Sequence, residues 1–311
     1  MIRSIVYDAE QSGPELLVLG AVHGNEVCGP AAIERVCAEL DTGRLTLTRG
    51  RARFVPVCNP RAYAAGARFI ERNLNRYLVP METPDSYEAR LGNILCPLLE
   101  RCDALLDLHS SPRGNVPYAF VGPANAAEYA FAASLGASWL MTGWEETYAA
   151  ADDGGGVVDP NEGIGTEQAV RRHGGLAALV ECGDHSDTVA AADVAYRAIH
   201  GALRHLGMIE AAEISVPTAR LARMSKVFYR TDAGRCAKDW QDFDAVKANE
   251  LIATRANGEQ IRAPADGLVI LPHPDAPIGG EWFYFGQEEA MPLAHTPRPS
   301  PTQPLRSGCC R

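Results

Sequence analysis

The amino-acid sequence predicts an α/β protein whose mostly parallel, mixed sheet has helices on both faces, followed by a smaller all-β domain. Over the first two thirds of the 311 residues, short and nearly continuous apolar runs alternate with stretches that have helical spacing of apolar residues. Strands that are apolar along their whole length are typical of parallel sheets buried between two layers of helices. After about residue 209 the pattern changes to short strand-like runs separated by turn residues.

Four apolar runs are expected to form the strands of the first domain: Glu15–Val22, Arg53–Cys58, Ala104–Leu108 and Ala177–Val180. Three stretches have apolar residues at helical spacing: Gly29–Leu40, Tyr87–Cys102 and Thr188–Leu206. Pro30 lies in the expected first turn of the first helix, where its missing N–H leaves no hydrogen bond unmade. This alternation is what a parallel sheet with crossover helices requires.

The second domain is expected over residues 209–290. Its predicted strands are Lys226–Tyr229, Glu250–Thr254, Gly267–Leu271 and Glu281–Phe285. Turn signals such as Asn257-Gly258 separate these runs. Residues 1–208 are therefore assigned to the α/β domain, and residues 291–311, where prolines lie among polar residues, to an irregular tail.

The charge balance excludes several functional classes. Asp and Glu number 39 against 29 Lys and Arg, a formal net charge of −10. This argues against nucleic acid and anionic membranes as partners, since both need a basic surface. No apolar run reaches the roughly 20 residues that span a bilayer, and the polar N-terminal residues do not resemble a signal peptide. The nine cysteines include no CxxC pair, which favours free thiols in the cytoplasm.

Residues able to bind a metal ion follow the predicted strands at their carboxyl ends. His23 and Glu26 follow the first strand, and His109 and Glu181 follow the third and fourth. Ligands of open parallel sheets bind beyond these strand ends, so the four side chains are expected at one rim. Two histidines and one carboxylate leave a zinc ion an open position for water, as in catalytic sites. Asp107, on the same strand face as His109, is expected to orient the site.

Each of these residues alone has an ordinary explanation. A single HxxE pattern is a weak sign of a metal site, and a histidine at a strand end is often simply hydrogen-bonded. A glutamate in that position is often a solvated charge. Their coincidence at one rim favours a metal site, while physical reasoning from the sequence leaves both interpretations open.

Five motifs together resemble the succinylglutamate desuccinylase/aspartoacylase family, whose members are related to the zinc carboxypeptidases. They are Gly20–Glu26 (GAVHGNE), Asn59–Ala62 (NPRA), Arg68–Arg76 (RFIERNLNR), Asp107–Ser110 (DLHS) and Glu181–Gly183 (ECG). Their order and spacing extend through roughly 200 residues, so the resemblance is specific at the family level. It implies a zinc-carboxypeptidase-like catalytic fold with a C-terminal β domain beside it.

The resemblance also implies roles for individual residues. His23, Glu26 and His109 would bind one zinc ion per chain. Glu181 would act as general base and then general acid. Arg68 would polarise the scissile carbonyl.

A further set of residues would bind the substrate, again by resemblance. Asn75 and Arg76 would hold a substrate carboxylate, together with Arg171, for which Arg172 is an alternative. Tyr284 is a candidate tyrosine from the β domain, but its aromatic run WFYF favours a place in the β-domain core.

Two positions depart from the family pattern. Asn73 stands where the family commonly has Asp, which removes a negative charge beside Arg76 and leaves the substrate open. Cys182 stands where Val or Leu is common, which changes only packing.

The predicted function is hydrolysis of the amide bond of an N-acyl amino acid, by Glu-assisted attack of zinc-bound water. A zinc carboxypeptidase or an esterase using the same site is the alternative among enzymes, and a non-catalytic zinc-binding protein is the alternative outside them. The expected partner is a small-molecule substrate. A homodimer is compatible with the sequence but not specified by it.

Overall fold

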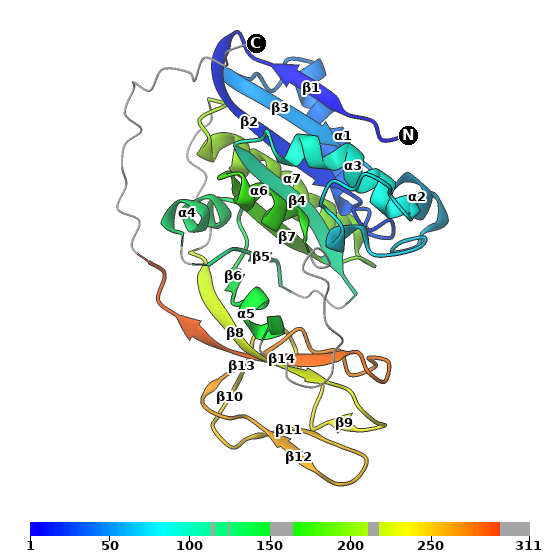
Figure 1. Cartoon of the computed structure of the whole chain (residues 1–311). Coiled ribbons are helices and arrows are strands. Elements are labelled where there is room, and N and C mark those ends of the chain that lie inside the picture. The colour runs from blue at the N-terminus through cyan, green and yellow to red at the C-terminus, as the bar shows by residue number, and fades with distance from the viewer. Residues whose placement is uncertain (113–115, 124, 150–163, 211–217, 293–311) are drawn as a thin grey trace.

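The computed structural model describes residues 1–112, 116–123, 125–149, 164–210 and 218–292 (Figure 1). Its main feature is an 11-stranded sheet with the strand order β1-β3-β2-β4-β7-β5-β6-β8-β14-β13-β10. The strands of this sheet are β1 Ile5–Asp8, β2 Gln11–Gly20, β3 Arg49–Val55, β4 Ala104–Ser111, β5 Tyr118–Phe120, β6 Trp139–Thr142, β7 Leu176–Asp184, β8 Arg220–Tyr229, β10 Asp244–Val246, β13 Gly267–Ile270 and β14 Glu281–Glu289. The pairs β3–β2, β2–β4, β4–β7, β5–β6 and β6–β8 are parallel, which confirms a mostly parallel but mixed core.

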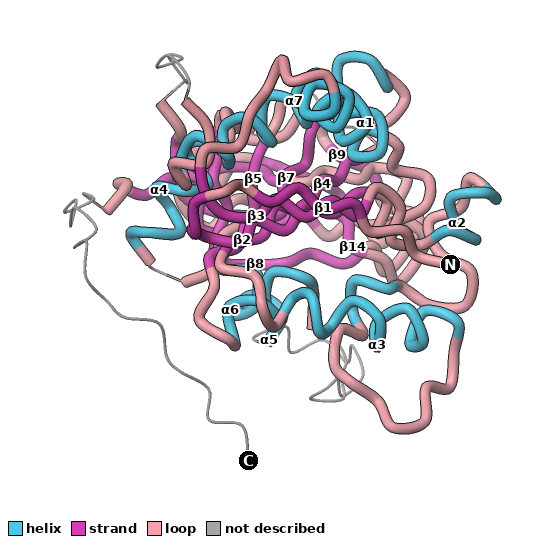
Figure 2. Tube along the Cα trace, turned by 90° about the horizontal axis from the view of Figure 1, so that it is seen from above, coloured by secondary structure: helices cyan, strands magenta, loops and turns pink. Residues whose placement is uncertain are grey.

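Helices cover both faces of this sheet, as the sequence predicts. The helices are α1 Cys28–Asp41, α2 Pro60–Ala65, α3 Tyr87–Leu99, α4 Ala126–Ser134, α5 Trp144–Ala149, α6 Thr166–Arg172 and α7 Thr188–His205, with a short 3₁₀ turn η1 at Leu74–Arg76. Viewed from above, α1 and α7 lie on one face, while α3, α5 and α6 lie on the other (Figure 2). No helix of the described residues is both long and apolar enough to cross a membrane.

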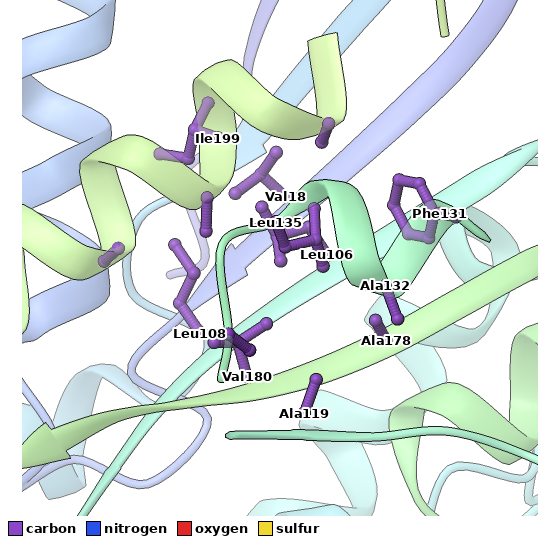
Figure 3. Packing of buried hydrophobic residues seen from close by; sticks show 14 of the residues in the cluster. Val18, Leu106, Leu108, Ala119, Phe131, Ala132, Leu135, Ala178, Val180 and Ile199 are labelled. Atoms are coloured by element: carbon purple, nitrogen blue, oxygen red, sulfur yellow. The ribbon is translucent and has the colours of Figure 1, made fainter. Parts of the chain in front are cut away.

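The central strands divide their side chains between two apolar clusters. In β2, Leu16 and Val18 pack in the cluster beneath α1 and α7, and Leu17 and Leu19 pack in the cluster beneath α3 and α6. Figure 3 shows the first cluster, where Val18 and its neighbours meet Ile199 of α7. Alternation of side chains along a strand explains this division. It also explains why these strands are apolar at every position.

The register between β4 and β7 positions two of the predicted site residues. His109 of β4 is the direct partner of Glu181 of β7 in the parallel ladder. The predicted strands ended at Leu108 and Val180, but β4 and β7 continue to Ser111 and Asp184. The strand pairing therefore includes His109 and Glu181 themselves, and backbone hydrogen bonds fix the position of each residue along its strand.

The C-terminal strands extend the same sheet. β8 pairs with β6 in parallel, and β14, β13 and β10 follow it in this spatial order, each antiparallel to its neighbour. A separate three-stranded sheet has the order β12-β11-β9, with the strands β9 Arg235–Cys236, β11 Leu251–Thr254 and β12 Gln260–Arg262. The division of the chain at residue 209 thus stays a proposal, because the backbone ladder runs across it.

Some elements were not predicted, and one predicted segment lies outside the description. The short strands β1, β5 and β6 and the helices α4 and α5 are additions to the predicted order. None of the described cysteines forms a disulfide, and six of them are buried. Of the predicted tail, residues 293–311 lie outside the described residues, and they include Cys309 and Cys310.

Candidate metal centre

The three predicted metal ligands lie together at the carboxyl ends of the central strands. His23 and Glu26 belong to the turn between β2 and α1, and His109 lies near the end of β4. All three side chains are buried. Ala21 begins the turn with a φ of 44°, a left-handed conformation that few non-glycine residues adopt. Strain of this kind is typical of functional sites, where the surrounding structure holds it in place.

Gly24 allows this turn to lie directly against α2. A Cβ atom at Gly24 would be 2.1 Å from the carbonyl carbon of Ala62, so any other residue would force the two segments apart. The Gly24 amide donates a hydrogen bond of 3.1 Å to the carbonyl oxygen of Arg68. This contact brings Arg68 to the same rim although it is 42 residues from Glu26 in the chain.

The ligand atoms converge on one small volume. The Nδ1 atoms of His23 and His109 are 3.2 Å apart. Glu26 Oε1 is 2.9 Å from Nδ1 of His23, and Glu26 Oε2 is 2.9 Å from Nδ1 of His109. One ligand atom from each of the three residues lies within 4.8 Å of the others. Two imidazole nitrogens and a carboxylate are a donor set suited to zinc.

The hydrogen bonds of His23 favour a cation at this position. Asn73 Oδ1 lies 2.9 Å from Nε2 of His23 and also accepts from the amide of Asn75 at 3.0 Å, so it acts as an acceptor. Nε2 must therefore carry the proton, and burial lowers the pKa of His23, which favours the neutral ring. A neutral ring protonated at Nε2 presents the lone pair of Nδ1 to the carboxylate of Glu26. Two acceptors facing each other in this way are satisfied by a shared metal ion.

Asp107 contacts the imidazole of His109 at Nε2, the ring nitrogen that faces away from Glu26. The fully buried Asp107 carboxylate has Oδ2 at 3.0 Å from Nε2 of His109. The same oxygen accepts a hydrogen bond of 2.5 Å from Oγ1 of Thr166 in α6. Asp107 therefore contacts the ligand on the side away from Glu26, as the strand periodicity predicted. A carboxylate in this position fixes the ring and raises its basicity.

The buried charges shift the pKa values of these ligands in opposite directions. Burial would raise the pKa of Glu26, but the two neighbouring imidazoles hold it well below its ordinary value. Burial would lower the pKa of His109, but Asp107 and Glu26 raise it well above its ordinary value. The cluster thus keeps a carboxylate ionised in a buried setting, which is a property of sites that bind a cation.

Glu181 lies beside this cluster with an oxygen that has no partner. Its Oε2 atom is buried and accepts no hydrogen bond within the described part of the chain. Burial, followed by the negative charge of Glu26, raises the pKa of Glu181 to about 8. A buried carboxylate with a free oxygen and a raised pKa is suited to accept and return a proton.

A cavity of about 410 Å³ opens in front of the cluster. The predicted site residues that line it are His23, Arg68, Asn75, Arg76, His109 and Glu181. Arg68 is half-exposed, and its Nη1 donates a hydrogen bond of 2.8 Å to Oε1 of Glu26. Arg68 thus places a guanidinium at the mouth of the site, next to a ligand carboxylate.

Asn75 and Arg76 reach the cavity from η1. The Asn75 side chain is buried, and its Oδ1 accepts a hydrogen bond of 2.8 Å from the amide of Thr166. Arg76 Nη1 donates to the carbonyl oxygen of Asn75 at 2.8 Å. Among the described residues Arg76 has no carboxylate partner.

Arg171 and Tyr284 line hollows that adjoin this cavity, and their role in substrate binding stays a prediction. Arg171 lines an adjoining hollow, where its Nε atom is 3.0 Å and 3.1 Å from the two carboxylate oxygens of Glu128. The charge of Arg171 is therefore already paired by a residue of α4. Tyr284 is buried and lines an adjoining cavity of about 160 Å³, and its ring packs 5.2 Å from that of Trp144. Its aromatic surroundings match the core interpretation.

Three residues contribute to the site without having been assigned a role from the sequence. Asn73 is hydrogen-bonded to the ligand His23, although the sequence marked it only as a departure beside Arg76. Glu167 and Tyr118 both line the cavity. Helical spacing between Glu167 and Arg171 was a usable signal for Glu167. The three-residue strand that carries Tyr118 offered none.

Comparison with protein families agrees with this geometry. A family model described as the succinylglutamate desuccinylase/aspartoacylase catalytic domain matches residues 12–183. The "Probable aspartoacylase" of Prochlorococcus marinus subsp. pastoris is 29% identical over 102 residues, 31% of this chain and 33% of the relative. The succinylglutamate desuccinylase of Pseudomonas paraeruginosa is 31% identical over 115 residues, 34% of each chain. The chain thus matches about a third of the length of these curated relatives.

Solved structures share the fold over nearly the whole chain. A succinylglutamate desuccinylase/aspartoacylase from Rhodobacter sphaeroides has a TM-score of 0.73 at 18% identity and covers 93% of this chain and 89% of its own. A succinylglutamate desuccinylase from Silicibacter sp. TM1040 has a TM-score of 0.70 at 22% identity, with the same coverage of both chains. The similarity therefore includes the C-terminal β region as well as the α/β part.

Proposed function

Because the chain belongs to the succinylglutamate desuccinylase/aspartoacylase family, we propose that it is a zinc-dependent hydrolase that cleaves the amide bond of an N-acyl amino acid. The observation that carries the proposal is the convergence of His23, Glu26 and His109 beside the unpartnered carboxylate oxygen of Glu181. A purely structural metal site has no need of a base. The homodimer and the cytoplasmic location stay predictions.

His23, Glu26 and His109 would hold the zinc ion. When bound, zinc supplies a Lewis acid that lowers the pKa of water and polarises a carbonyl. Asn73 and Asp107 would keep the two imidazoles aimed at it, since each contacts the ring nitrogen on the far side.

Glu181 would transfer the proton in both halves of the reaction. It takes a proton from the attacking water as the new C–O bond forms, and passes that proton to the amide nitrogen as the C–N bond breaks. The products are a carboxylate and a free amino acid.

Two arginines would handle the charges of the substrate. Arg68 would stabilise the negative oxygen that develops on the attacked carbonyl, because its guanidinium lies at the mouth of the site beside Glu26. Arg76 and the amide of Asn75 would bind the α-carboxylate, since both line the cavity and Arg76 has no acidic partner among the described residues. A planar guanidinium holds a carboxylate through two parallel hydrogen bonds.

The proposal is tested by assaying N-acyl amino acids, dipeptides and simple esters side by side with the zinc-loaded protein. N-acyl amino acids should be the best substrates, and a chelator should abolish turnover until zinc is restored. Faster cleavage of peptides would favour a carboxypeptidase, and faster cleavage of uncharged esters an esterase. Bound zinc without turnover of any of these substrates would favour a non-catalytic protein.

A further inference from the structure

Glu167 places a second, opposite charge in the cavity that contains Arg76. It belongs to the first turn of α6 and lines the same space as Arg76 and Asn75. Its carboxylate accepts a hydrogen bond of 3.3 Å from Oγ1 of Thr166. Within the described part of the chain no basic residue forms an ion pair with the Glu167 carboxylate.

Gly165 leaves room for this carboxylate at the wall of the cavity. A Cβ atom at Gly165 would lie 2.9 Å from Oε2 of Glu167 and 3.1 Å from Oδ1 of Asn75. The two side-chain oxygens thus border the same small space, with a glycine between them. Two acceptor oxygens in one corner of a binding cavity favour a ligand that offers hydrogen-bond donors there.

The basic residue nearest to Glu167 along the helix does not offset its charge. Arg171 is bound by both oxygens of Glu128, and its Nη1 lies 3.7 Å from a carboxylate oxygen of Glu145. Glu145, Glu146 and Glu167 all line the hollow that Arg171 occupies. With Glu128, these four carboxylates outnumber the two arginines that face them, Arg171 and Arg223, and an acidic substrate side chain would meet repulsion there.

We propose that the substrate is an N-acyl amino acid whose side chain carries a positively charged amino group, with Arg76 binding its α-carboxylate and Glu167 binding its ammonium. This inference rests on the proposed deacylase function and narrows its substrate class. An ammonium offers three donors and a compact charge, which complements the Glu167 and Asn75 oxygens. An acidic side chain would need an unpaired cation, and Arg171 is paired.

A structural role for Glu167 leads to a different expectation. An acidic residue in the first turn of a helix stabilises that helix through the helix dipole. Removing its charge would then lower stability and affect all substrates alike. A role in recognition instead requires an effect that depends on the charge of the substrate side chain.

The test compares Nα-acetyl amino acids of matched side-chain length, using the full-length zinc-loaded protein. The panel contains diamino acids with two to four side-chain carbons, acidic amino acids, and neutral analogues of similar size. We expect the best diamino substrate to exceed its neutral analogue by about 10-fold or more in kcat/KM, the effect of one hydrogen bond between charged groups. Acidic substrates should be the poorest.

Variants connect this preference to Glu167. Glu167→Gln should lower kcat/KM for the diamino substrate by about 10–100-fold and leave the neutral analogue within about threefold. Glu167→Lys should shift the preference toward acidic substrates. The matched control is Glu259→Gln, which makes the same change at an exposed carboxylate beside Arg255 that does not line the cavity. Its substrate preference should equal that of the wild type.

The outcomes separate this inference from the function on which it rests. If acidic N-acyl amino acids are cleaved fastest, the deacylase function stands and the inference is wrong. An equal loss on all substrates in Glu167→Gln also overturns it. If no N-acyl amino acid is cleaved, the proposed function itself fails. Titration calorimetry with the free diamino acid and with aspartate then checks the charge preference without turnover.

Discussion

Replacing Asp107 by Asn should weaken zinc binding although Asp107 is not one of the three proposed ligands. Asp107 is fully buried, and its Oδ2 lies 3.0 Å from Nε2 of His109. The same oxygen accepts a hydrogen bond of 2.5 Å from Thr166. Asn has nearly the same shape and can still accept from His109, so the variant removes the charge while the geometry is retained.

The expected magnitude follows from this contact. Loss of a carboxylate behind a ligating histidine lowers metal affinity by about 10–100-fold, which corresponds to about 1.4–2.8 kcal/mol. The upper part of this range is expected, because Asp107 is buried and its charge is little screened by water. Zinc affinity is measured by competition with a chromogenic chelator.

A matched control makes the result decisive. Asp103→Asn makes the same change just before the start of β4, where the carboxylate only accepts from the amide of Glu15 at 2.7 Å. This variant should bind zinc like the wild type. If folded Asp107→Asn also binds zinc within about twofold of the wild type, Asp107 does not support His109 and the reasoning is wrong.

Three further predictions concern substrate binding, pH and packing. Arg76→Ala should raise KM for N-acyl amino acids by about 10–100-fold but leave KM for analogues without the α-carboxylate unchanged. Equal effects on both kinds of substrate would show that Arg76 does not bind the α-carboxylate. Burial raises the pKa of Asp242 from 3.8 to about 6. The neutral Asp242 carboxyl favours the folded state, so its contribution to stability is complete at low pH and lost as pH rises through about 6. Asp242→Asn removes the ionisation, so it should raise the thermal midpoint, relative to the wild type, more at about pH 8 than at about pH 4. A pH-independent difference between the two thermal midpoints would contradict this. Leu106 lies in the middle of β4 and has no exposed surface. Leu106→Ala should lower the free energy of unfolding, measured in urea, by about 2–5 kcal/mol. A loss below about 1 kcal/mol would show that the surrounding core closes the space left by the deleted side chain.

The sequence was most informative where a pattern was long or where chemistry coincided with a strand end. The apolar run that became β2 is buried on both faces, so both of its faces are apolar and the strand is visible without an alignment. β5 and β6 have three and four residues, too few for any periodicity to show. β7 continues beyond its apolar run because backbone pairing with β4 does not require apolar side chains.

The same limits apply to the site. His23, Glu26 and His109 were predicted because parallel strands bring their carboxyl ends to one rim, which is a property of the topology. The contact of Arg171 with Glu128 was not predicted, since Glu128 lies 43 residues away in a helix that the sequence did not reveal. Spacing along the chain locates a charge but does not show which other charge neutralises it.

The central claim is that Glu181 acts as the base of a zinc site held by other residues. The most direct test is Glu181→Gln, measured for zinc content and for kcat on the best N-acyl amino acid. We predict unchanged zinc content and a kcat lower by about 10²–10⁴-fold, the contribution of a positioned acid–base group. A folded, zinc-loaded Glu181→Gln variant with the kcat of the wild type would contradict the account.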